Sequence, residues 1–160
     1  MSNLLLDTCA LLWLAAAVTA SDPKRKNISP KLFSLVLWIV PIISLFAAAA
    51  IYPVNLGYPL DITFISELLM GLLFVVIGNY LPKARQNYTI GVRIPWTLAN
   101  EENWNRTHRL AGYLWMACGL VMILNSLIRF VPSEWVFGLF MIMVLVPCIY
   151  SYWLHTSKGL

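Results

Sequence analysis

Residues 62–81 read ITFISELLMGLLFVVIGNYL, and residues 110–128 read LAGYLWMACGLVMILNSLI. Each stretch is almost wholly apolar and about 20 residues long, which is the length that an α-helix needs to cross a bilayer core of about 30 Å. Each stretch also carries two glycines seven residues apart, which is about two helical turns, so both glycines lie on one face. Small residues let transmembrane helices approach closely. The two stretches therefore predict a pair of packed transmembrane helices.

The glycine spacing also predicts how these two helices meet. In an antiparallel pair, a single register brings Gly78 opposite Gly112 and Gly71 opposite Gly119, because the spacing is the same on both helices. We therefore expect these four glycines to form the packing face.

The same register predicts a polar site within the pair. It brings Arg129 level with Asp61, and it places Glu67 within about one turn of Asn125 and Ser126. A carboxylate inside a membrane costs a few kcal/mol unless it is paired, protonated or hydrated. Glu67 is therefore either a structural residue hydrogen-bonded to the facing helix, or a ligand-contacting or protonatable group in a cavity at this end. The sequence leaves both interpretations open.

The composition predicts a membrane protein throughout. Apolar residues make up 60% of the 160 residues and charged residues 11%, whereas soluble domains carry about 25% charged residues. This deficit excludes a soluble globular chain and a disordered one. We expect an all-α polytopic membrane helix bundle that forms a single domain over residues 1–160. The five predicted transmembrane helices cover residues 3–20, 32–52, 62–81, 110–128 and 135–153.

The basic residues predict the orientation of the bundle. Five crossings place ten of the eleven Lys and Arg residues on one side and leave Arg129 on the other. Cytoplasmic loops are enriched in Lys and Arg, so we expect the N-terminus outside and the C-terminus inside. The ten residues are Lys24, Arg25, Lys26, Lys31, Lys83, Arg85, Arg93, Arg106, Arg109 and Lys158.

The predicted cytoplasmic loop, residues 82–109, is too rich in Asn, Arg, Trp and Pro for a flexible linker. Asn100 is a suitable N-cap for a helix that continues into the fourth span. Glu101, Trp104 and His108 then share a helical face. Glu101 and His108 are a possible acid/base pair, and Arg93 and Arg109 are possible ligands for lipid phosphates or an anionic partner. A structured docking or stabilising element is the interpretation that we favour.

No pattern in the sequence predicts a metal or a cofactor. Cys9, Cys118 and Cys148 lie in apolar segments without CxxC spacing, so we expect small packing residues there. The basic residues follow the membrane boundaries, so we expect a lipid bilayer as partner and no direct contact with nucleic acid.

The loop and its flanks resemble the SdpI family of bacterial toxin-immunity membrane proteins. The matching positions are residues 22–28 (DPKRKNI), 78–83 (GNYLPK), Asn87, 91–93 (GVR), 95–98 (PWTL), Trp104, 107–109 (THR) and Gly112. The resemblance implies a multi-pass protein of the bacterial plasma membrane. The founding member protects a toxin producer from its own secreted membrane-active peptide, and it recruits a transcriptional repressor to the membrane. Longer members begin with a further helix and an extracellular segment, so we expect a short form here.

We therefore expect a non-enzymatic immunity protein with a binding site at each side of the membrane, and a homodimer is an assembly that the sequence allows. On the outside, Glu67, Asn125 and Arg129 would contact a secreted peptide toxin. On the inside, the loop would hold the bundle together or signal to a cytosolic transcriptional repressor. The residues expected to serve this inner role are Arg93, Trp96, Glu101, Trp104, His108 and Arg109. The alternatives are a membrane enzyme acting on a lipid or isoprenoid phosphate, and a scaffold that docks a cytosolic regulator.

Overall fold

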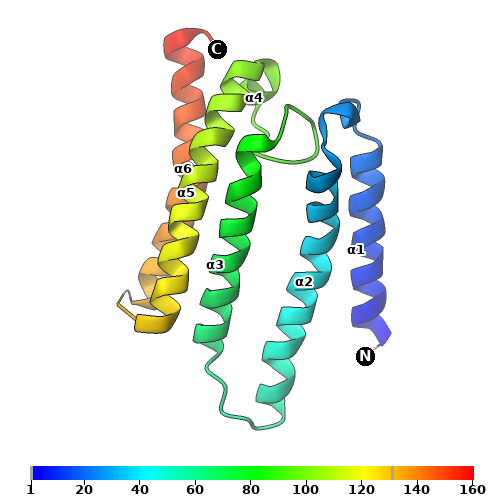
Figure 1. Ribbon diagram of the computed structural model, residues 1–160, viewed down its shortest axis with the longest axis vertical. Helices are drawn as coiled ribbons and strands as arrows, with labels where there is room; N and C mark the ends of the chain where they lie inside the picture. The colour runs from blue at the N-terminus through cyan, green and yellow to red at the C-terminus, as the bar shows by residue number, and fades with distance from the viewer. Residues whose placement is uncertain (1, 131) are drawn as a thin grey trace.

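Helices that run up and down side by side make up most of the molecule (Figure 1). The structure, a computed structural model, describes the backbone of residues 2–130 and 132–160, and the side chains of this part outside residues 2–9, 50, 133 and 134. The long helices are α1 (Ser2–Ala20), α2 (Pro30–Asn55), α3 (Ile62–Tyr80), α5 (Glu101–Ile128) and α6 (Ser133–Lys158). Short elements are η1 (Arg25–Asn27), η2 (Leu81–Lys83) and α4 (Pro95–Ala99).

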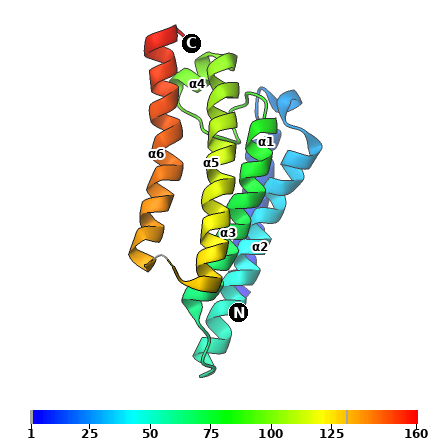
Figure 2. The same cartoon turned by 60° about the vertical axis from the view of Figure 1, so that its left-hand side comes forward.

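The long helices stand nearly in a row, in the order α6, α5, α3, α2, α1 (Figures 1 and 2). We call one end of this row the basic end: it holds the connection at residues 21–29, the segment at residues 81–100 and the C-terminus. The other end, which we call the turn end, holds the connections at residues 56–61 and 129–132. The N-terminus also lies there, so the two termini are at opposite ends of the bundle.

Four helices in the described part of the chain are long and apolar enough to cross a membrane, namely α2, α3, α5 and α6. This finding agrees with four of the spans expected from the sequence, and it identifies a multi-pass membrane protein. The first expected span is helical, but the side chains described there belong to the shorter stretch Ala10–Ala20. Its crossing of the membrane stays a prediction, as does the orientation of the termini.

Helices α3 and α5 pack through their glycines in the register that the spacing predicts. A Cβ atom placed on Gly71 would lie 2.8 Å from the carbonyl oxygen of Gly119, and one placed on Gly78 would lie 2.8 Å from that of Gly112. Both distances are too short for any side chain. The absence of Cβ atoms therefore lets the two backbones touch at two levels.

Helix α6 packs on the other face of α5. Trp115 of α5 donates a hydrogen bond of 3.0 Å from Nε1 to the carbonyl oxygen of Met143 in α6. The buried cluster between α3, α5 and α6 consists of Phe74, Cys118, Met122 and Met143. Helix α5 thus lies between α3 and α6 and contacts both of them.

Helix starts follow the capping signals in the sequence. The Asn100 side chain accepts hydrogen bonds from the backbone N–H groups of Glu102 and Asn103, at 2.8 and 3.0 Å. It therefore begins α5 at Glu101, nine residues before the apolar span expected at residues 110–128. Part of the predicted loop is accordingly helical, and it forms the first turns of α5 at the basic end.

Candidate functional site

A polar pocket of about 250 Å³ lies between α3 and α5 at the turn end. Its central contact is a hydrogen bond of 2.9 Å, which the Asn125 side-chain amide donates to Glu67 Oε2. Glu67 is only 7% exposed, and Asn125 only 3%. The lining residues are Thr63, Phe64, Glu67, Asn125, Ser126, Arg129 and Pro132.

An ion pair between Arg129 and Asp61 joins the two helices at the rim of this pocket. Arg129 ends α5 in the left-handed conformation, with φ at 53°, and its N–H donates to the carbonyl oxygen of Asn125 at 2.8 Å. Asp61 also begins α3 by accepting a hydrogen bond from the Phe64 N–H at 3.0 Å. The pocket thus combines a buried carboxylate with a guanidinium group at its edge. Such a site is suited to a ligand with both hydrogen-bond donors and acceptors.

At the basic end, His108 holds the irregular loop against α5. Its Nε2 accepts a hydrogen bond of 3.0 Å from the Val92 N–H, and its Nδ1 lies 2.9 Å from the Trp104 carbonyl oxygen. The first bond requires Nε2 without a proton, so Nδ1 carries the proton and donates it to Trp104. Gly91 lies against the Nε2 edge of the ring, because a Cβ there would come within 2.2 Å of Nε2. Both ring nitrogens therefore form hydrogen bonds with backbone groups.

Trp104 and Asn103 connect this loop to the rest of the bundle. The indole of Trp104 is fully buried, stacks on His108 with ring centroids 3.9 Å apart, and donates from Nε1 to the Ala84 carbonyl oxygen at 2.8 Å. Asn103 donates to the carbonyl oxygens of Ser151 and Leu160, at 3.0 and 3.1 Å. Helix α6 and the loop are thus fixed to the same two turns of α5.

Asp22 is a second organising residue of the basic end, and sequence reasoning did not single it out. Its carboxylate accepts hydrogen bonds from the Tyr88 N–H at 2.9 Å, the Lys24 N–H at 2.7 Å and the Thr89 hydroxyl. Burial alone would raise the pKa of Asp22, but these bonds outweigh it and hold the pKa below its ordinary value of 3.8. The signals in the sequence are its place at the start of the matching segment 22–28 and an acid beside the strongly basic residues 24–31.

Gln86 also joins the two segments at the basic end. Its side-chain oxygen accepts a hydrogen bond from Lys24 Nζ at 2.5 Å, and its backbone oxygen accepts one from the Asn27 amide at 2.7 Å. Its own amide donates to the Thr97 carbonyl oxygen at 2.9 Å. Residues 22–28 therefore bind the loop through side chains that contact both backbone groups and side chains of the loop. These contacts, with those of Asp22, form one network.

The remaining residues expected at the inner site are not brought together. Arg93 is exposed and donates to the Tyr88 carbonyl oxygen at 2.7 Å. Trp96 packs edge-on against Tyr152 of α6, with ring centroids 5.4 Å apart. Arg109 is exposed further along α5. The inner candidates are therefore spread over different faces of the basic end.

The acid/base pair considered from the sequence is not assembled. Glu101 is exposed in the first turn of α5. His108 is only 1% exposed, and both of its ring nitrogens form hydrogen bonds with backbone groups. The two residues share a helical face, but of the two only His108 is covered by the loop, through Gly91 and Val92. Within the described residues, no group of three or more His, Cys, Asp and Glu side chains is placed to hold a metal ion.

Comparison with known proteins finds similarity to a protein family in the basic-end loop and in α5 and α6. Residues 83–151 match the family model described as the SdpI/YfhL protein family. Over 98 aligned residues the chain is 31% identical to the Immunity protein SdpI of Bacillus subtilis (strain 168). The alignment covers 61% of this chain and 46% of that protein. The chain thus spans about half the length of the curated relative that it matches. No solved structure matches the chain significantly. The segment 83–151, from the basic-end loop through α5 and most of α6, belongs to the SdpI/YfhL protein family.

Proposed function

We propose that this chain is a non-enzymatic immunity protein of the bacterial plasma membrane, which protects the cell from a secreted membrane-active peptide toxin. The similarity to a protein named for immunity supports this proposal. In the proposed topology, five helices cross the membrane with the N-terminus outside and the C-terminus inside. The excess of Lys and Arg at the basic end supports this orientation.

The observation that carries the proposal is the buried Glu67 carboxylate in the pocket at the turn end. In this topology the pocket faces outside, where a secreted peptide arrives. A peptide amine or an unpaired backbone N–H would donate to the Glu67 carboxylate, and peptide carbonyl groups would accept from Arg129. Capture there would keep the peptide from the lipid phase, where it acts.

A second role is proposed for the basic end, namely docking of a cytosolic regulator. The supporting observation is that the irregular segment at residues 84–94 is held by many polar contacts and still leaves Arg93 exposed. A fixed loop with an exposed guanidinium group suits recognition of an acidic protein surface.

A protection assay tests the first role. The chain is expressed in a sensitive bacterium, which is then challenged with the secreted products of the parent strain, and survival is measured for equal amounts of membrane-inserted protein. Glu67→Ala is expected to lose most of the protection, and Arg129→Gln part of it. Gly138→Ala is the control, because a Cβ there meets no atom within 4 Å.

The order of the variants locates the function. If His108→Ala abolishes protection while Glu67→Ala retains it, the essential site lies at the basic end and the proposed pocket is wrong. If the unmodified chain gives no protection although it is in the membrane, the immunity proposal fails. A small cytosolic protein that co-purifies with the chain, and is lost in Arg93→Gln, would then support the docking role.

A further inference from the structure

A second pocket, of about 440 Å³, lies between α5 and α6 at the basic end. Its lining residues are Arg106, Arg109, Leu110 and Tyr113 of α5 and Tyr150 of α6. Two guanidinium groups and two phenol hydroxyls thus surround one space, and no acidic residue of the described part of the chain lines it. This set of donors is complementary to an anion.

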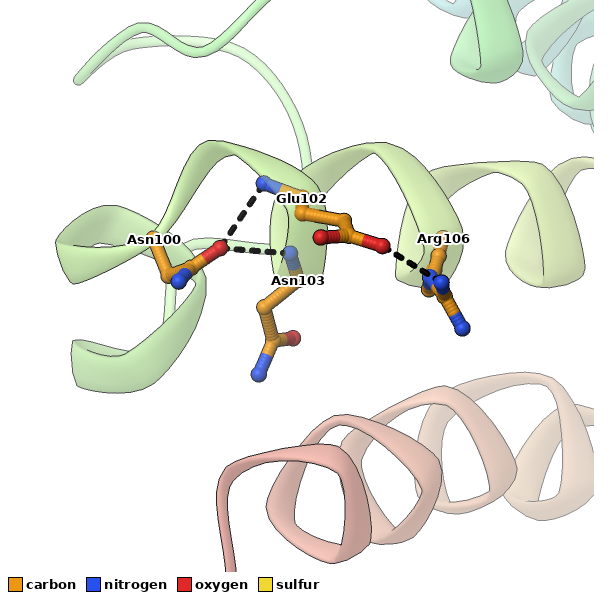
Figure 3. A network of polar contacts seen from close by, with 4 residues as sticks. All are labelled: Asn100, Glu102, Asn103 and Arg106. Atoms are coloured by element: carbon orange, nitrogen blue, oxygen red, sulfur yellow. Dashed lines mark hydrogen bonds and ion pairs between the residues drawn. The ribbon is translucent and has the colours of Figure 1, made fainter. Parts of the chain in front are cut away.

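The donors of this pocket are largely unused. Arg106 pairs with Glu102 one turn earlier in α5, as Figure 3 shows. Arg109, in contrast, has neither an ion pair nor a hydrogen bond with any residue that the structure describes, and the same is true of the hydroxyls of Tyr113 and Tyr150. A guanidinium group stays charged at any physiological pH. Among the described residues, no acidic group therefore neutralises the charge of Arg109.

In the topology proposed above, on which this inference rests, the pocket lies at the level where α5 enters the membrane. Arg109 is followed directly by the apolar stretch that begins at Leu110. From Arg106 to Tyr113 the helix rises about 10 Å, while the headgroup region of each leaflet is about 5–8 Å thick. In that topology the arginines lie at the depth of the lipid phosphates, and Tyr113, which is 61% exposed, lies beside the first part of the acyl chains.

We propose that this pocket binds the phosphate of an anionic glycerophospholipid of the adjoining leaflet. Arg109 would hold two phosphate oxygens at once, which is the geometry that guanidinium groups favour. The hydroxyls of Tyr113 and Tyr150 would donate to the remaining phosphate or ester oxygens. Leu110 and the ring of Tyr113 would contact the acyl chain. Such a lipid bridges α5 and α6 near the turns that also fix the loop.

Lipid titration of the purified full-length chain tests this proposal. The protein is stripped of lipid in a neutral detergent, and its melting temperature is measured against increasing mole fractions of dioleoylphosphatidylglycerol or dioleoylphosphatidylcholine. A third series contains inorganic phosphate and no lipid. We expect the anionic lipid to raise the melting temperature at a lower mole fraction than the zwitterionic lipid does, and phosphate alone to have little effect.

Variants locate the site. Arg109→Gln removes one charge-assisted contact, so we expect the half-saturating mole fraction of phosphatidylglycerol to rise about tenfold. Tyr150→Phe keeps the ring and removes one hydroxyl, so a rise of about threefold is expected. Lys26→Gln is the matched control, because it removes one exposed positive charge from the basic end outside this pocket.

Each other outcome contradicts the proposal. An equal response to both lipids in the unmodified protein would exclude anion recognition. An equal loss in Lys26→Gln and Arg109→Gln would show a general charge effect instead of a site. Full stabilisation by phosphate alone would assign the pocket to a soluble phosphate ester. If Arg109→Gln does not fold, an unchanged titration of Tyr150→Phe and Tyr113→Phe overturns the proposal.

Discussion

The Asn125 amide donates a hydrogen bond of 2.9 Å to the Glu67 carboxylate, and both side chains are buried between α3 and α5. The bond lies about one turn from the Gly71–Gly119 contact, where the two backbones meet. A charged acceptor strengthens a hydrogen bond where water is scarce. The close glycine packing thus supports the polar pair, and the pair joins the two helices next to the pocket.

This relationship predicts an energetic coupling between the two side chains. Glu67→Ala and Asn125→Ala should each destabilise the protein, because each leaves the other polar group buried without this bond. The double variant should lose about 0.5–2 kcal/mol less than the sum of the two single losses. Thermal unfolding in detergent measures this difference. Additive losses would show that the bond contributes nothing to stability.

Ser126→Ala is the matched control for that cycle. Ser126 lines the same pocket, but its hydroxyl donates to the Ile123 carbonyl oxygen of its own helix at 2.7 Å. It should therefore show no coupling to Glu67→Ala.

The glycine contacts predict a strong size limit between α3 and α5. Gly71→Ala and Gly78→Ala should each cost about 1–3 kcal/mol, because the added methyl group meets backbone atoms 2.8 Å away that cannot move independently. The expected result is a lower melting temperature of the detergent-solubilised protein. Gly138→Ala introduces the same methyl group on α6 into open space, so it should keep the melting temperature within error or raise it.

The backbone at Gly91 predicts a second effect of a single methyl group. Gly91 has φ at 118°, and a Cβ there would lie 2.2 Å from His108 Nε2. Gly91→Ala should break the bond between the Val92 N–H and His108 in addition to straining the backbone. Gly57→Ala separates these two effects, because Gly57 has φ at 83° with no atom within 4 Å of a Cβ. We expect Gly91→Ala to cost about 1–3 kcal/mol more, and equal losses in the two variants would contradict the contact.

Helix-to-helix contacts could be predicted from the sequence because they follow helical periodicity. The glycine spacing gave the register of α3 and α5, and this register in turn placed Arg129 beside Asp61 and Glu67 near Asn125. The N-cap Asn100 likewise gave the start of α5. In each case a fixed rise and turn per residue converts spacing into position.

The contacts of the irregular segments could not be predicted in this way. Asp22 binds Tyr88 and Thr89 across more than sixty positions, and Gln86 binds the Thr97 backbone. Such bonds depend on where two loops meet, which no periodicity encodes. Helical periodicity also does not predict which residues of a shared face are buried. Glu101 and His108 share a face, yet only His108 reaches the level where the loop covers α5.

The contacts of Asp22 predict how acid affects stability. The pKa of Asp22 lies below 3.8 in the folded protein because the hydrogen bonds to its carboxylate outweigh the opposing effect of burial. A carboxyl group with a depressed native pKa stabilises the fold above its unfolded value, and this contribution is lost as the pH falls through the native pKa. Unfolding in detergent at pH 6 and at about pH 3 should therefore show a loss on acidification that is smaller in Asp22→Asn.

Glu102→Gln is the matched control, because it removes a carboxylate whose ion pair with Arg106 is exposed. Exposed pairs of this kind contribute about 0–1 kcal/mol, so this variant should keep the acid sensitivity of the unmodified protein. Asp22→Asn should also be less stable at pH 6, because an amide nitrogen cannot accept the bonds that one carboxylate oxygen receives from Tyr88 and Thr89. If Asp22→Asn and the unmodified protein lose equal stability on acidification, the acid sensitivity arises from other carboxylates and the loop is not held by a charge at Asp22.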